Sequence, residues 1–193
     1  MTSFFIGIAG GSGTGKTALA EELRQYFGKE AAVLHMDNYQ RFGEKLRKLY
    51  GMKNWDHPEA INWDKLLKDL ILLKNGQAIT IKLREQKTLK KVKTVIFPPS
   101  KIIIIEGYLL FYKTPIRKLI NFRIYLEASE DARVKRRSKI KGKGDRYIKK
   151  VVLPMHRRYI EPTKKYANLV INTDKSSIKH CCKQVVRHLP NRF

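Results

Sequence analysis

The chain of 193 residues has little cysteine and no long apolar run. Its two cysteines, Cys181 and Cys182, are adjacent, which is a poor arrangement for a structural disulfide, so we expect a reduced, cytoplasmic setting. The densest aliphatic stretch, Ile102 to Ile105, is far shorter than the roughly 20 residues that span a bilayer, so no membrane partner is expected. The apolar N-terminal residues follow no basic segment, and we therefore expect no signal peptide.

Acidic residues are scarce as well. The sequence has 17 Asp and Glu against 41 Lys and Arg, which gives a formal net charge of +24. This excess favours an anionic partner, such as a nucleotide, a nucleic acid or an acidic membrane. Lysine nevertheless occurs along every segment, as it would on a merely solvated surface. Nucleic acid is open but disfavoured, because no aromatic residues alternate with the basic run from Lys82 to Lys93.

Glycine, in contrast, is concentrated in one stretch near the N-terminus. The segment fits the pattern G-x-x-x-x-G-K-[ST], in which backbone N–H groups surround nucleotide phosphates at the start of a helix. A short apolar strand (residues 4–9) precedes it and an amphipathic helix (residues 17–27) follows, which is the context that the motif requires. The predicted nucleotide-binding residues are Gly10, Gly11, Ser12, Gly13, Thr14, Gly15, Lys16 and Thr17. Lys16 would reach the β- and γ-phosphates, and the Thr17 hydroxyl would hold Mg²⁺.

Strands and helices alternate along the rest of the chain, which predicts an α/β fold with a parallel sheet in a single domain over residues 1–193. Two further segments, 78–83 and 92–97, are expected to form a β hairpin outside the main sheet, so that residues 78–97 form a small β excursion. Residues 41–55 contain no clear periodic pattern. Further strands are expected at 31–36, 101–106, 122–126 and 168–172. Helices are expected at 63–74, from Ser129 to Gly142, at 145–159 with a bend or an interruption near Pro154, and at 176–189 with both cysteines in the core.

Two carboxylates stand at the ends of predicted strands, where parallel sheets bind ligands. Asp37 follows the second strand and could accept the proton of an attacking hydroxyl, although a turn or cap role is equally open. Glu106 directly follows Ile102 to Ile105, a position typical of a second magnesium-binding element, and Gly107 would permit close backbone approach.

Three arginines share one face of the helix that begins at Ser129, because Arg133, Arg136 and Arg137 are spaced at i, i+3 and i+4. Arginine binds phosphate in a planar, bidentate manner. We therefore predict an Arg-rich lid over residues 129–150 that stabilises charge during phosphoryl transfer.

The ordered blocks resemble the uridine kinase family of P-loop kinases, within the phosphoribulokinase/uridine kinase group. They are residues 10–17, Asp37 with Tyr39, the segment 55–60 (WDHPEA), Glu106 with Gly107, and the segment 162–167 (PTKKYA). The resemblance implies a three-layer P-loop NTPase fold with a five-stranded parallel sheet and helices on both faces. It also implies an ATP-dependent transfer to the 5′-hydroxyl of a uridine- or cytidine-like ribonucleoside.

Carried over to this sequence, the resemblance makes Asp37 the base, with Lys16 as the second catalytic residue, and makes Thr17 and Glu106 the magnesium ligands. It makes Tyr39, Asp56, His57 and Arg133 substrate-binding residues, with Asp56 at the sugar hydroxyls.

Two family elements are missing. The stretch 81–84 (IKLR) lacks the family's Tyr and His near the pyrimidine, and Ile140-Lys141 replaces an Arg-Asp pair late in the lid. Uridine specificity therefore does not follow from the resemblance. Three alternatives remain: a kinase of another small alcohol such as nicotinamide riboside or pantothenate, a nucleic-acid-associated P-loop NTPase, and a nucleotide-binding regulator. The preference for ATP over GTP and a homo-oligomeric state also stay open.

Overall fold

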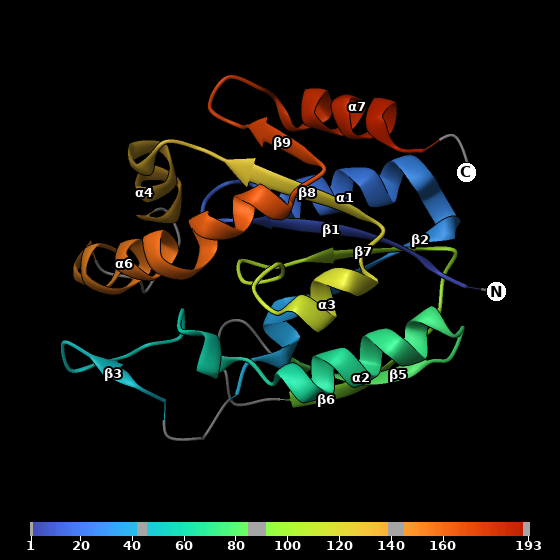
Figure 1. Cartoon of the computed structure of the whole chain (residues 1–193), viewed down its shortest axis with the longest axis horizontal. Coiled ribbons are helices and arrows are strands. Elements are labelled where there is room, and N and C mark those ends of the chain that lie inside the picture. Colours follow the sequence, from blue (N-terminus) through green and yellow to red (C-terminus); the bar gives the residue numbers. More distant parts are fainter. Residues whose placement is uncertain (1, 42–45, 85–91, 139–144, 191–193) are drawn as a thin grey trace.

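The computed structural model describes residues 2–41, 46–84, 92–138 and 145–190. Five of the described strands form one parallel sheet in the order β2-β7-β1-β8-β9 (Figure 1). The predicted five-stranded parallel sheet is thereby confirmed, with each strand end close to its predicted position. The strands are β1 (Phe4–Gly10), β2 (Ala31–His35), β7 (Ile102–Glu106), β8 (Phe122–Glu127) and β9 (Leu169–Asn172).

Helices cover both faces of this sheet, as predicted. The helices α1 (Lys16–Phe27) and α7 (Ile178–His188) lie on one face, and α2 (Trp63–Lys74) and α3 (Thr114–Leu119) lie on the other (Figure 1). Two side-chain caps fix where helices begin, because Asn62 Oδ1 accepts from Lys65 N and Ser177 Oγ accepts from His180 N. The three-layer architecture therefore follows from apolar faces that must each be buried against the sheet.

Strand β7 shows why the sheet is apolar on both sides. All of its residues are buried, and successive isoleucines alternate between two hydrophobic clusters. Ile103 and Ile105 belong to the cluster with α2 and α3, whereas Ile102 and Ile104 belong to the cluster with α1 and α7. This is the pattern of a central parallel strand, in which a continuous aliphatic run replaces the polar-apolar alternation of a half-exposed strand. Cys181 and Cys182 are buried in the second cluster, as predicted.

The β excursion forms the predicted antiparallel hairpin, β5 (Ile79–Arg84) with β6 (Val92–Phe97), and this hairpin is separate from the main sheet. In the stretch 41–55, for which no helix or strand was predicted, β3 (Lys48–Leu49) and β4 (Met52–Lys53) pair in a short hairpin. Its turn contains Tyr50 and Gly51, both with positive φ. Two-residue strands are too short to give a periodic signal, which is why this hairpin was missed.

The helix predicted at 145–159 is present and continues through Pro154 without interruption. It runs from α5 (Asp145–Tyr147) through the π-helical η4 (Ile148–Val152), α6 (Leu153–Met155) and the π-helical η5 (His156–Ile160). Proline lacks an N–H donor and crowds the preceding turn, and π-helical widening lets a helix pass such a residue. The helix predicted from Ser129 is α4 (Glu130–Ser138), and the lid positions Ile140 and Lys141 lie outside the described residues. Shorter 3₁₀ segments are η1 (Gly28–Glu30), η2 (Met36–Tyr39), η3 (Pro58–Ala60) and η6 (Glu161–Tyr166).

Candidate active site

The glycine-rich segment forms a tight loop between β1 and α1. Gly13 and Gly15 have φ values of +87° and +92°, a conformation that side-chain-bearing residues rarely adopt. A Cβ atom at Gly13 would also lie 2.6 Å from the backbone oxygen of Arg133. Thr14 Oγ1 donates to Gly11 O at 2.9 Å, and Lys16 Nζ donates to the same oxygen at 2.9 Å. The loop is therefore closed by its own side chains and packed against α4.

Lys16 is the electrostatic centre of the site. Burial lowers the pKa of its ammonium group, and the charges of Glu106, Asp37 and Asp56 oppose that change. Three carboxylates from distant parts of the chain thus act on one cation beside the loop. The ends of β2 and β7 lie side by side, because His35 pairs with Glu106, so Asp37 and Glu106 follow adjacent strand ends; their catalytic roles stay predictions.

Glu106 sits at the end of β7 within reach of two partners. Its Oε1 accepts from Thr17 Oγ1 at 3.3 Å and lies 2.8 Å from His35 Nδ1. Burial opposes ionisation, but the hydrogen bond with His35 and the charge of Lys16 outweigh it, so the pKa of Glu106 lies below its ordinary value. The same hydrogen bond raises the pKa of His35. An ionised carboxylate beside a hydroxyl is an oxygen donor set of the kind that suits Mg²⁺.

Asp37 is the second residue of η2, directly after β2. The preceding Met36 is fully buried, and a Cβ atom at Gly107 would lie 2.4 Å from Met36 Cβ. Only glycine fits at position 107, so the segments that carry Glu106 and Asp37 pass close to one another. This close approach brings the predicted base and the predicted metal ligand to the same edge of the sheet.

Asp56 is buried, and its carboxylate is already in contact with a phenol. Tyr147 Oη donates to Asp56 Oδ2 at 2.8 Å and accepts from Trp55 N at 3.2 Å. Tyr108 Oη donates to Trp55 O at 2.7 Å, so the segment is held from two sides. Neither tyrosine was predicted as a site residue from the sequence. Tyr108 could have been noticed because it follows Glu106-Gly107, whereas Tyr147 gave no signal.

The three arginines of α4 pack against the loop. Arg136 Nη1 donates to Gly13 O at 3.2 Å, and Arg137 Nη1 bonds to Ser12 Oγ. Arg133 is buried with its Nη1 atom directed at Gly11, and within the described residues its Nε and Nη1 atoms have no hydrogen-bond partner. Burial lowers the pKa of Arg133, which is the penalty expected for a desolvated cation. An anion at the loop would relieve this penalty, so the orphaned guanidinium atoms fit a phosphate group.

His156 is a second buried group that the sequence analysis missed. Its ring lies against Gly11 beside Arg133, and among the described residues its Nδ1 atom has no partner. Burial and then the charge of Arg133 lower the pKa of His156 to about 3. The imidazole is therefore neutral at every pH at which the protein would be assayed.

This buried imidazole predicts a loss of stability in acid. Between pH 6.5 and the folded-state pKa the unfolded chain binds a proton that the folded chain does not, so stability falls as pH falls. From about pH 6.5 to about pH 5 the loss is about 2 kcal/mol for one full proton. His156→Leu should flatten this slope relative to wild type in urea unfolding at each pH, whereas His180→Gln, at an exposed histidine, should leave it unchanged. An identical slope in wild type and His156→Leu would contradict the prediction.

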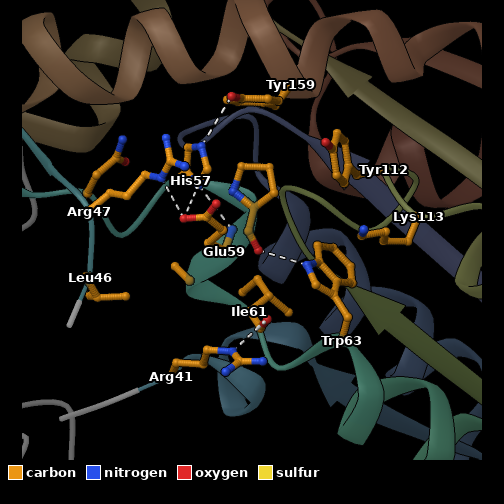
Figure 2. Close-up of a pocket in the computed structure, with 13 residues that line it drawn as sticks. Arg41, Leu46, Arg47, His57, Glu59, Ile61, Trp63, Tyr112, Lys113 and Tyr159 are labelled. Atoms are coloured by element: carbon orange, nitrogen blue, oxygen red, sulfur yellow. Dashed lines mark hydrogen bonds and ion pairs between the residues drawn. The ribbon is translucent and has the colours of Figure 1, made fainter. Parts of the chain in front are cut away.

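Two predicted substrate-binding residues lie elsewhere. Tyr39 is buried, and its hydroxyl donates to Asp69 Oδ2 at 2.9 Å. His57 lies between Tyr159 and Glu59 in a pocket of about 540 Å³ (Figure 2). None of the residues that line this pocket belongs to the phosphate loop. Tyr39 thus contacts Asp69, and His57 lines a pocket that no phosphate-loop residue lines. Their substrate roles stay predictions.

A second pocket, of about 400 Å³, adjoins the loop on the side of β8 and α4. Thr14, Arg133 and His156 line it together with acidic side chains, of which Glu127 pairs with Lys164. Arg133 and His156, whose side chains carry buried nitrogen atoms without a partner among the described residues, therefore border an open space beside the phosphate loop.

A parallel sheet whose central strand runs into a phosphate loop, with carboxylates at the ends of two neighbouring strands, defines the protein as a P-loop phosphotransferase. The family model described as the Phosphoribulokinase / Uridine kinase family matches residues 5–177. The chain belongs to this family, and the resemblance seen in the sequence is confirmed. The kinase prediction is confirmed with it, and membership implies ATP as the co-substrate and a small-molecule acceptor.

Two curated relatives and two solved structures show the extent of the similarity. A uridine kinase of Chlamydia pneumoniae is 34% identical over 99% of this chain and 92% of its own length. A uridine kinase of Halobacterium salinarum is 32% identical over 91% of this chain and 83% of its own length. A possible uridine kinase from Bacillus stearothermophilus has a TM-score of 0.63 at 22% identity, covering 89% of each chain. Phosphoribulokinase from Rhodobacter spheroides has a TM-score of 0.66 at 13% identity, covering 92% of this chain and 74% of its own.

Within the described residues, none of the helices is both long and apolar enough to cross a membrane.

Proposed function

We propose that the chain transfers the γ-phosphoryl group of ATP to the 5′-hydroxyl of a ribonucleoside of the uridine or cytidine type. The observation that carries the proposal is the phosphate loop with Lys16 beside the adjacent ends of β2 and β7, where Thr17 donates to Glu106 and Asp37 follows β2. Loop, cation and carboxylates together supply the parts that phosphoryl transfer requires. The relatives named as uridine kinases support a nucleoside as the acceptor.

The phosphates would lie in the loop of residues 10–17, at the N-terminus of α1, where backbone N–H groups and the helix dipole favour an anion. Lys16 would contact the transferred group, and Arg133 would gain in a phosphate the partner that the described residues do not provide. Thr17 and Glu106 would hold Mg²⁺, which when bound neutralises charge on the phosphates.

The reaction itself exchanges one bond for another. The acceptor oxygen bonds to the γ-phosphorus while the bond from that phosphorus to the bridging oxygen of ADP breaks. Asp37 accepts the proton of the acceptor hydroxyl, and Asp56 binds a sugar hydroxyl so that the reacting oxygen faces the phosphate. Tyr108 donates to Trp55 O and so holds the segment that carries this carboxylate.

The proposal is tested by measuring ADP formation with a panel of acceptors at fixed MgATP. The panel holds uridine, cytidine, nicotinamide riboside, pantothenate and a short RNA with a free 5′-hydroxyl. We expect uridine or cytidine to raise turnover at least about tenfold above the water background, since a bound acceptor hydroxyl replaces a diffusing water. Stimulation by nicotinamide riboside or pantothenate alone would show that the acceptor is that compound and not a uridine- or cytidine-type nucleoside. Stimulation by RNA alone would favour a polynucleotide kinase. No stimulation by any acceptor would overturn the proposal.

A further inference from the structure

Two buried nitrogen atoms on the same side of Gly11 have no hydrogen-bond partner within the described residues. One is Nη1 of Arg133 in α4, and the other is Nδ1 of His156 in η5. A Cβ atom at Gly11 would lie 2.6 Å from the first and 2.9 Å from the second. Because both atoms lie around one point, the guanidinium and the imidazole are neighbours over the phosphate loop.

These two side chains explain why residue 11 is a glycine. The other glycines of the loop have positive φ, whereas Gly11 does not. No left-handed backbone conformation therefore requires glycine at position 11. A side chain there would instead collide with Arg133 and His156. Glycine at this position leaves room for both of them against the loop.

The two unpaired atoms have complementary chemistry. A guanidinium can only donate, and its Nη1 atom carries two N–H groups. A neutral imidazole has one N–H donor and one nitrogen with a free lone pair. Burial, then the charge of Arg133, lowers the pKa of His156 to about 3, so the ring is neutral. The adjacent positive charge favours the tautomer that has its lone pair on Nδ1 and its proton on Nε2.

A neutral partner suits an arginine that must also attract phosphate. A carboxylate would offset the charge of Arg133, and Glu130, the carboxylate whose charge acts most strongly on it, is paired with Arg157 at 2.8 Å. An imidazole can fix the direction of the guanidinium while its charge stays available. If one N–H of Nη1 bonds to His156, the second N–H and Nε remain for an anion.

We propose that His156 is a positioning residue for Arg133: in the nucleotide-bound enzyme its Nδ1 atom accepts a hydrogen bond from Nη1 and directs the guanidinium at the phosphates. His156 itself contacts neither the phosphates nor the acceptor, so its effect is exerted through Arg133. The inference rests on the proposed function in one respect, namely that the loop binds the phosphates of ATP. It does not depend on which acceptor is phosphorylated.

The test is a double-mutant cycle on nucleotide affinity with His156→Leu, Arg133→Met and the double variant. Calorimetry measures the Kd of a non-hydrolysable ATP analogue with Mg²⁺ at neutral pH, so no acceptor is needed. We expect His156→Leu to raise this Kd about tenfold, because a hydrogen bond to a charged group is lost. The same substitution should change the Kd less than about twofold when Arg133 is already methionine.

Conservative variants identify which ring nitrogen matters. The amide of asparagine offers a neutral acceptor close to the place of Nδ1, so His156→Asn should regain most of the lost affinity. The amide of glutamine reaches toward the place of Nε2, so His156→Gln should bind as weakly as His156→Leu. His180→Gln, at an exposed histidine, is the matched control and should keep the wild-type Kd.

Nitrogen-15 NMR of the wild-type ring reports the tautomer directly. The chain has five histidines, and the signals that disappear in His156→Asn belong to His156. With the analogue bound we expect a proton on Nε2 and none on Nδ1 at neutral pH. A proton on Nδ1 in the complex would overturn the proposal, because a protonated nitrogen cannot accept from a guanidinium.

The remaining outcomes separate this inference from the proposed function. An unchanged Kd in His156→Leu would overturn the inference, and so would an equal increase with and without Arg133, since His156 would then act independently of it. If the expected coupling is found but no acceptor is phosphorylated, the proposed function fails and the role of His156 is kept. Absence of nucleotide binding by the wild type would overturn both.

Discussion

Replacing Lys16 with alanine is expected to lower kcat by about 100-fold or more, because preorganised charge at the transferred group contributes strongly to the rate of such reactions. Its Nζ atom lies 2.9 Å from Gly11 O inside the loop, and three carboxylates act on it. The loss should appear in kcat more than in the KM for ATP, since the backbone amides of the loop remain. Steady-state ADP formation at saturating acceptor measures it.

The fold should not suffer from this change. Burial lowers the pKa of Lys16, which means that folding works against its charge, so Lys16→Ala should unfold at the same temperature as wild type or above it. Lys29→Ala, at an exposed lysine after α1, is the matched control and should keep wild-type turnover. Turnover of the Lys16→Ala enzyme equal to wild type would remove the phosphate loop from the reaction.

Asp37→Asn is expected to reduce kcat by about 100- to 10,000-fold, the range over which a positioned general base contributes. The amide keeps the size of the side chain but cannot take the proton of the acceptor hydroxyl. The KM for ATP should stay within about twofold of wild type, since the proposed role of Asp37 is on the acceptor side. Single-turnover measurements of phosphoryl transfer separate this loss from slow product release.

Asp64→Asn provides the control, because Asp64 is an exposed residue in the first turn of α2. It removes the same charge at a distance from Lys16 and should leave turnover unchanged. Wild-type kcat in Asp37→Asn would exclude the base role and leave Asp37 as an electrostatic partner of Lys16.

The sequence predicted those parts of the molecule that depend on local pattern. The phosphate loop, the aliphatic strand that ends in Glu106 and the amphipathic helices are each encoded within a short run of consecutive residues, and the structure has them at the expected positions. The parallel order of the strands followed from the alternation of strand and helix. Convergence of Asp37 and Glu106 followed from the rule that parallel strands end at one edge.

The contacts that tune the site could not be predicted, because they join residues far apart in the chain. His35 reaches Glu106 across 71 positions, and Tyr147 reaches Asp56 across 91. His156 carries no motif, and only the packing of a helix that passes Pro154 brings its ring to the phosphate loop. Such contacts depend on how helices are seated on the sheet, which periodicity does not report.

The strand order also determines when the phosphate loop can form during synthesis. Among the described strands, β1 pairs only with β7 and β8, and β2 pairs only with β7, so the two main-sheet strands that precede β7 in the chain are not neighbours. Consider a nascent chain that ends at the β5–β6 hairpin. It contains the complete glycine-rich segment, but β7 and β8, the strands that pair with β1 in the described sheet, have yet to be made. Nucleotide therefore cannot stabilise the growing polypeptide until its second half has left the ribosome, and folding of this enzyme waits on contacts of long sequence separation.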